Sequence, residues 1–183
     1  MKKFFLLILI IIVAVVYFGF KGNNSNQDPI SQETSNGSFQ PDPSNATFIF
    51  DEGAITLSQG KFSRTLAPNS AIKEETALTS IRGYGDINND NKNDTVAILV
   101  QSGGASGVFI YLAGYVSGPV TYKGTNAIFL GDRITPQSIS INRGLVTVNY
   151  LDRKDGEPFA AEPTVPTQKT FEYKSGALLE IRN

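Results

Sequence analysis

The hydrophobic pattern divides the chain into three parts. Residues 4–20 form an uninterrupted apolar run, residues 22–45 are rich in Asn, Ser, Gln and Pro, and short apolar or alternating runs occupy residues 46–183. These patterns are typical of a membrane-spanning helix, a flexible linker and a folded β domain. We therefore predict an N-terminal transmembrane signal anchor over residues 1–21, a disordered polar linker over 22–45 and an extracytoplasmic β domain over 46–183.

The first segment is long enough to act as an uncleaved anchor. As a helix, residues 4–20 would span roughly 25 Å, close to the ~30 Å hydrocarbon core of a bilayer. The run exceeds the roughly 7–15 apolar residues of a signal peptide, and no pattern of small residues for cleavage follows it. Lys2 and Lys3 precede the run, which places the N-terminus in the cytoplasm. We expect a single-pass protein of the cell membrane with an extracytoplasmic domain.

The third part shows the pattern of an all-β fold. Its short runs are separated by turn signals such as Arg143-Gly144 and Ser175-Gly176, and no long helical period is present. One or two helical turns fit residues 70–76. The sequence predicts a mostly antiparallel sandwich or barrel-like domain. The candidate strands are 47–50, 54–57, 77–84, 95–101, 108–115, 120–122, 127–130, 138–141, 145–150, 169–173 and 178–182.

Composition removes several kinds of chemistry. The chain of 183 residues has a formal net charge of -1, so no basic surface for nucleic acid is expected. It contains no Cys and no His, which removes thiolate catalysis, Ser–His nucleophiles and the commonest zinc ligands. The remaining hard oxygen ligands of Asp and Asn favour calcium or magnesium.

The strongest candidate site is a loop in which oxygen-bearing side chains alternate. Asp86, Asn88 and Asp90 supply side-chain oxygens at positions one, three and five, Lys92 a backbone carbonyl at position seven, and Asp94 a carboxylate at position nine. Calcium binds six to eight such oxygens at about 2.3–2.6 Å. We predict one bound calcium ion. The alternative is a polar turn in which Asn and Asp cap their own backbone without metal.

Two departures separate this loop from an EF-hand. Position six is Asn91, where a glycine is usual, and position twelve is Ala97, where an EF-hand carries Glu. The segment GDINNDNKND, followed directly by the apolar run TVAILV, resembles the calcium loops of FG-GAP propeller repeats. It also resembles the first half of dockerin loops. The match occurs once, so it implies a calcium loop before a strand and not a propeller.

A second resemblance covers about residues 77–171. The segments GDINNDNKND, SGGASGVFIYLAGYV, GTNAIFLGDRITPQSISI and VNYLDRKDGEP are together similar to a family of small exported bacterial domains of unknown function. Members of that family usually carry Gly in the loop, where this chain has Asn89 and Asn91. The resemblance implies a single fold and an exported compartment, and it implies no reaction.

These observations favour a calcium-stabilised binding or interaction module. Its partners would be the membrane, through the N-terminal helix, and an envelope protein or glycan. The alternative is a hydrolase of cell-envelope polymers that uses two carboxylates, for example Glu157 with Glu162. A third hypothesis is a structural component of an envelope assembly. The irregular segment 151–167 is either a surface crossover or a functional loop, and Asp132-Arg133 and Asp152-Arg153 are expected to form ion pairs that hold such loops.

Overall fold

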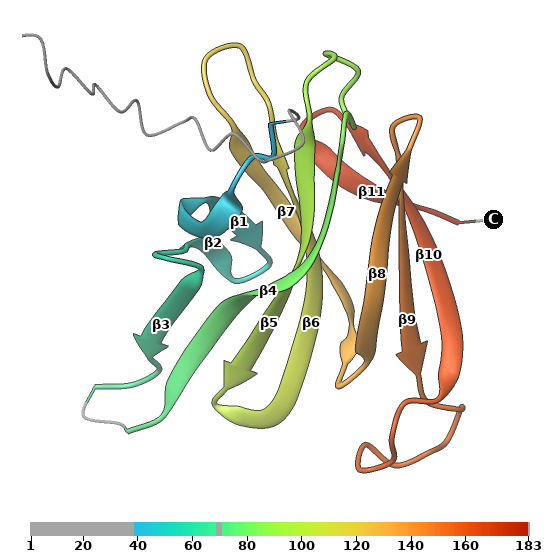
Figure 1. Cartoon of the computed structure of the whole chain (residues 1–183). Coiled ribbons are helices and arrows are strands. Elements are labelled where there is room, and N and C mark those ends of the chain that lie inside the picture. Colours follow the sequence, from blue (N-terminus) through green and yellow to red (C-terminus); the bar gives the residue numbers. More distant parts are fainter. Residues whose placement is uncertain (1–38, 69–70, 183) are drawn as a thin grey trace, which may run out of the picture. The chain divides into compact units, whose positions relative to one another are not determined.

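The computed structural model describes residues 39–68 and 71–182, and this part of the chain is all-β (Figure 1). It contains one short 3-10 helix, η1 (Pro43–Asn45), and no α-helix in the described ranges. The strands are β1 (Thr47–Phe50), β2 (Gly53–Thr56), β3 (Lys61–Thr65), β4 (Lys73–Gly85), β5 (Asp94–Gly103), β6 (Ala105–Val116), β7 (Lys123–Asp132), β8 (Thr135–Asn142), β9 (Leu145–Asp152), β10 (Val165–Lys174) and β11 (Ala177–Ile181).

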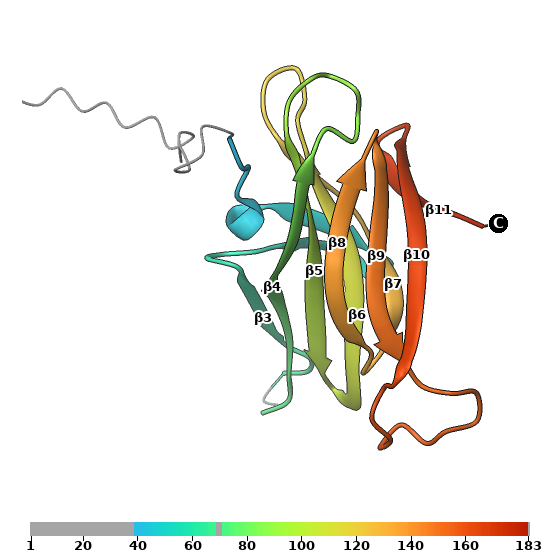
Figure 2. The same cartoon turned by 45° about the vertical axis from the view of Figure 1, so that its right-hand side comes forward.

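The strands form two sheets that together make a nearly closed barrel (Figure 2). One sheet has seven strands in the order β2-β1-β7-β6-β5-β4-β3, and the other has four in the order β11-β10-β9-β8. Every pairing is antiparallel except that of β1 with β7, which is joined at Ile49 and Asn126. The predicted all-β class is confirmed.

The alternating strand patterns produce two cores, one on each face of the larger sheet. The inner core lies between the sheets and contains Ile98, Leu112 and Phe171, which are fully buried. The outer core lies where the β1–β2 hairpin covers the larger sheet, and Phe48 is its fully buried centre. Because β5 packs on both faces, its residues from 94 to 99 are all buried. This explains the continuous apolar run that follows the polar loop in the sequence.

The two sheets approach at two seams with different chemistry. Between β4 and β8, a Cβ atom added at Gly83 would lie 2.6 Å from Ile139 Cγ2, so glycine is needed for the close packing. Between β7 and β11, the Asn126 side chain takes the place of a neighbouring strand and binds both backbone groups of Leu178. Its Nδ2 donates to the Leu178 carbonyl at 3.1 Å and its Oδ1 accepts from the Leu178 amide at 2.9 Å. The register of β6 with β7 shifts between the pairs Ala113–Ala127 and Tyr115–Gly124, and Asn126 lies at this irregularity.

The connections gather at two ends, which we name by their residues. The loop end contains the β4–β5 connection (86–93), the β6–β7 connection (117–122) and the turns 143–144 and 175–176 (Figure 2). The opposite end contains the β7–β8 turn and the β9–β10 loop (153–164). Arg143 and Ser175 have positive φ and each precedes a glycine with positive φ, as the predicted two-residue hairpin turns require.

The structure differs from the sequence prediction in three segments. The missed strand β3 is largely exposed and mostly polar, so alternation could not reveal it. The expected strand 120–122 instead belongs to the β6–β7 connection, where Val120 is 94% exposed. Of the residues 70–76, for which helical turns are expected, 73–76 instead belong to β4, which begins at Lys73 and pairs there with β3.

The folded domain begins earlier than the predicted boundary at residue 46. The Thr95 hydroxyl donates to the Pro41 carbonyl at 2.6 Å, and the Asn93 side chain donates to the Phe39 carbonyl at 3.0 Å. Asp42 caps η1 and forms an ion pair with Arg82 at 3.3 Å. Residues 39–45, expected as linker, therefore belong to the domain, and their prolines are buried at positions 41 and 43.

The predicted anchor and the linker up to residue 38 lie outside the described residues. Within the ranges 39–68 and 71–182, no helix has the length and apolar character needed to cross a bilayer.

Candidate functional site

The predicted calcium loop is the β4–β5 connection at the loop end. Asn89 and Asn91 have φ of 62° and 64°, so two asparagines adopt the left-handed conformation that glycine would otherwise supply. This conformation folds the chain back on itself and turns several amide N–H groups inward. The local backbone is thus compatible with the sequence despite the missing glycine.

The alternating side chains accept hydrogen bonds from the amides of the loop itself. Asp86 accepts from the Asp90 amide at 3.2 Å and from the Asn91 amide at 2.7 Å. Asn88 Oδ1 also accepts from the Asp90 amide, at 3.1 Å, and Asp90 accepts from the Lys92 amide at 2.9 Å. One nitrogen therefore lies next to oxygens of both Asp86 and Asn88. The predicted ligands at positions one and three are brought together, whereas the carboxylate at position five accepts a different amide of the same loop.

Asp94 is placed differently from the other predicted ligands. It is fully buried at the start of β5, and both its carboxylate oxygens accept backbone amides. The Ile87 amide donates at 2.9 Å and the Ser117 amide at 2.8 Å. Asp94 therefore joins the β4–β5 loop to the β6–β7 connection.

Ser117 completes this network, and the sequence analysis did not identify it. Its hydroxyl donates to Asp90 Oδ2 at 2.5 Å, and its carbonyl accepts from Asn88 Nδ2 at 2.9 Å. A single buried serine thus contacts three of the predicted ligand residues through its amide, carbonyl and hydroxyl groups. The only signal in the sequence was its place in the turn Ser117-Gly118-Pro119, which marks a hairpin and not a ligand.

The two central carboxylates respond in opposite directions to their surroundings. The hydrogen bond from the Ser117 hydroxyl is the main cause that lowers the pKa of Asp90. Burial is the main cause that raises the pKa of Asp94, although the two donated amide N–H groups oppose this shift. The exposed Asp90 carboxylate is thus favoured in its ionised form, whereas both oxygens of the buried Asp94 are occupied by backbone amides.

The loop offers two carboxylates, one amide oxygen and the Lys92 carbonyl to a metal ion. No group of three or more His, Cys, Asp or Glu side chains that could hold a metal lies in the ranges 39–68 and 71–182. The oxygens of Asp86 and Asp90 each have a second lone pair beyond the hydrogen bonds described. Calcium also accepts carbonyl and water oxygens, so the residues present fit calcium better than a transition metal.

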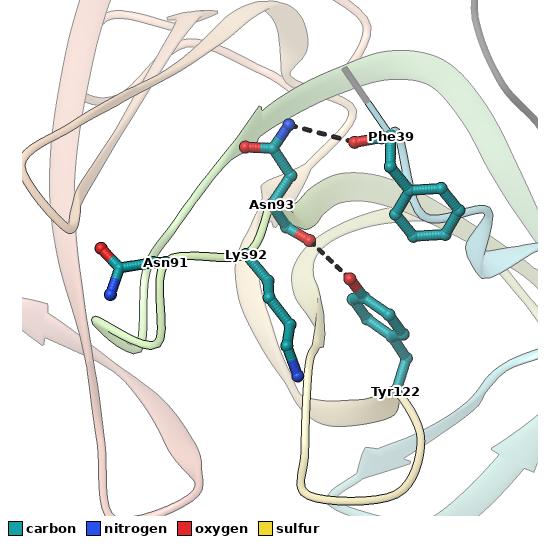
Figure 3. A pocket seen from close by; sticks show the side chains of 5 residues that line it. All are labelled: Phe39, Asn91, Lys92, Asn93 and Tyr122. Atoms are coloured by element: carbon teal, nitrogen blue, oxygen red, sulfur yellow. Dashed lines mark hydrogen bonds between the residues drawn. The ribbon is translucent and has the colours of Figure 1, made fainter. Parts of the chain in front are cut away.

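A pocket of about 350 Å³ adjoins the loop (Figure 3). It is lined by Phe39, Asn91, Lys92, Asn93 and Tyr122. The Tyr122 hydroxyl donates to the Asn93 carbonyl at 3.0 Å, and its ring lies 5.8 Å from that of Phe39. Lys92 extends beside Tyr122 (Figure 3), so the pocket combines aromatic walls, amide groups and one ammonium. Such a site can bind a small polar group that carries negative charge.

The irregular β9–β10 loop at the opposite end is held by Arg153. The guanidinium of this residue donates to the carbonyls of Ala161 at 2.8 Å, Asp132 at 3.1 Å and Arg133 at 3.0 Å. The expected ion pair of Asp132 with Arg133 is present at 2.8 Å. The expected pair of Asp152 with Arg153 is replaced by a bond from the Arg153 amide to the Asp152 carboxylate.

Comparison with protein-family models, with curated proteins and with solved structures finds no match to this chain.

Proposed function

We propose that this protein is a membrane-anchored, extracytoplasmic interaction module whose β4–β5 loop binds one calcium ion. The observation that carries the proposal is that oxygens of Asp86 and Asn88 meet at the amide of Asp90, whose own carboxylate accepts the Lys92 amide in the same loop. The 17 apolar residues of segment 4–20, after two lysines, support the anchor.

The ion would act on the arrangement of the loop end. It would neutralise the mutual repulsion of Asp86 and Asp90 and hold the loop against the β6–β7 connection. Because Asn93 and Tyr122 link these connections to Phe39, the ion would also fix the walls of the pocket. In this proposal calcium has a structural role, and the pocket or the surface around it binds the partner.

Thermal unfolding of the full chain in detergent, with calcium and with EDTA, tests the ion site. Extracellular calcium modules bind with dissociation constants of about 10⁻⁴–10⁻³ M. At ~1 mM calcium this gives roughly 0.4–1.4 kcal/mol of stabilisation, which raises the midpoint by a few degrees. The Asp86→Asn variant should lose the calcium response, because the amide keeps an acceptor but removes the charge. Equal midpoints with calcium and EDTA in the parent chain would contradict the ion site.

Flotation of the full chain with phosphatidylcholine vesicles tests the anchor separately. The chain should remain with the vesicles in high salt, because burial of an apolar helix does not depend on charge. Release from the vesicles by salt would contradict the anchor.

No observation in the described residues favours the alternative hydrolase over the interaction module. The residues that line the pocket include no carboxylate. Glu157 is used to cap its own loop, where its carboxylate accepts the Lys154 amide at 3.0 Å.

A further inference from the structure

The charged side chains of the loop end differ in their partners. The carboxylates of Asp86, Asp90 and Asp94 all accept backbone amides, and Asp94 is fully buried, whereas Asp90 is exposed. The cations of this end are exposed, and their side chains form no hydrogen bond or ion pair with the described residues. These cations are Lys92, Lys123, Arg143 and Lys174.

The four cations come from four separate connections or strand ends. Lys92 lies in the β4–β5 connection and Lys123 begins β7. Arg143 lies in the β8–β9 turn and Lys174 ends β10. The register of β9 with β10 pairs Leu145 with Glu172, which places the last two at the same end of the smaller sheet. The positive charge is therefore spread across the loop end.

An exposed apolar side chain projects from the same end. Val120 is 94% exposed in the β6–β7 connection, next to Pro119. The bond of Tyr122 to Asn93 and that of Asn88 to Ser117 fix this connection beside the β4–β5 loop. An apolar tip at the same end as exposed Lys and Arg is the composition of surfaces that lie on anionic bilayers, where apolar groups enter the interface and cations meet headgroups.

The N-terminal segment reaches the domain at this end. Phe39 is the first described residue, and it contacts Asn93 and Tyr122 beside the pocket. The apolar run 4–20 precedes it in the sequence. The chain that carries this run therefore joins the domain at the loop end and not at the opposite end.

We propose that the loop end is a docking surface for anionic lipid, with Val120 entering the interface and the four cations meeting headgroup phosphates. This proposal rests on the proposed membrane anchor only for the position of the tether. The pocket lined by Lys92 adjoins the β4–β5 loop at this end and suits a single phosphate or carboxylate of a headgroup. The partner of this interaction module is then the membrane surface itself.

The test uses tryptophan as a reporter, because the chain contains no Trp. Full-length Val120→Trp is reconstituted in vesicles with brominated acyl chains, made of phosphatidylcholine alone or mixed with phosphatidylglycerol. The matched control is Phe159→Trp, since Phe159 is 65% exposed in the β9–β10 loop at the opposite end. We expect strong quenching of Val120→Trp in anionic vesicles and little quenching of Phe159→Trp.

Charge removal provides the second measurement. Lys123→Gln and Lys174→Gln, each added to Val120→Trp, should lower the ratio of docked to undocked domains by about fivefold per residue. Lys154→Gln, in the β9–β10 loop, is the control and should leave the ratio unchanged. Both measured lysines are exposed, so their replacement leaves the packing intact.

The outcomes separate this proposal from that of the anchor. If the chain floats with neutral vesicles but Val120→Trp is quenched no more than Phe159→Trp, the docking surface is overturned and the anchor stands. If the chain does not float with neutral vesicles, yet Val120→Trp is quenched in anionic ones, the docking surface is supported without the anchor. Quenching of Val120→Trp that is the same with and without phosphatidylglycerol, and is unchanged by both lysine variants, would overturn the electrostatic basis of docking.

Discussion

The β4–β5 loop and the β9–β10 loop are both irregular, polar and placed at an end of the barrel, yet opposite kinds of side chain hold them. Acceptors hold the first loop: Asp94 alone binds the amides of Ile87 and Ser117. A donor holds the second: Arg153 binds three carbonyls. The difference follows from which backbone groups are left unpaired near each loop. Left-handed turns direct N–H groups inward in the first, whereas Arg153 binds one carbonyl of its own loop and two at the end of β7 and in the β7–β8 turn.

The role of a charged residue in a connection depends on whether its polar atoms already bind backbone groups. A carboxylate whose oxygens face amides contributes to folding first and leaves only its second lone pairs for a ligand. A guanidinium whose nitrogens already donate to backbone carbonyls has few N–H groups left to bind a substrate. The residues that remain available for partners are then the ones without such bonds, such as Lys92 and Val120 at the loop end.

Removal of the Asp94 carboxylate should have the largest effect. Asp94→Ala leaves two buried amides without an acceptor, and each unsatisfied group costs roughly 1–3 kcal/mol, so we expect a loss of about 2–5 kcal/mol. Asp94→Asn keeps one acceptor and should lose about half as much. Chemical unfolding followed by circular dichroism measures both. A loss below that of Arg153→Ala would contradict the assignment of Asp94 as the main link.

Removal of the Arg153 guanidinium should cost less, because its surroundings are only partly buried. Arg153→Ala should lose about 1–3 kcal/mol, since water can reach some of the freed carbonyls. Arg153→Lys cannot reproduce the planar fork and should recover only part of the loss. Limited proteolysis should then cut within residues 153–164. An unchanged cleavage rate would show that the three bonds do not restrain this loop.

The pH dependence of stability should show the smallest effect. The pKa of Asp90 is lowered in the folded protein, so its ionised form favours folding above its ordinary value of 3.8, and this contribution disappears as the pH falls through the lower folded value. The pKa of Asp94 is raised, so its ionisation disfavours folding as the pH rises above 3.8.

Ser117→Ala separates these two contributions. It removes the main cause of the Asp90 shift and keeps the amide that binds Asp94. Unfolding free energies measured in EDTA from pH 2 to 6 should lose a few tenths of a kcal/mol of their acid dependence, the scale of exposed charges. A variant with an unchanged pH profile would contradict the role of the serine hydroxyl.

The sequence predicted the class of fold and most strands, because strict alternation and two-residue turns are local signals. It predicted β1 with its observed bounds and both Arg143 and Ser175 turns. It missed β3, because only Phe62 in that strand is apolar and partly buried. The candidate loop was found from spacing alone. Two partners were not found: Ser117, which binds Asp94, and Leu178, which binds Asn126. Contacts between residues far apart in the chain leave no local pattern in the sequence.

The parallel pairing of β1 with β7 sets an order of events during folding. The β1–β2 hairpin has strands of four residues, too short for stability in isolation. Its pairing partner at Asn126 comes much later in the chain, so we expect the outer core to form only after β5, β6 and β7 have assembled. When the chain is synthesised from its N-terminus, β1 is therefore made well before its pairing partner β7. We therefore expect the segment nearest the tether to dock only after β7 has formed.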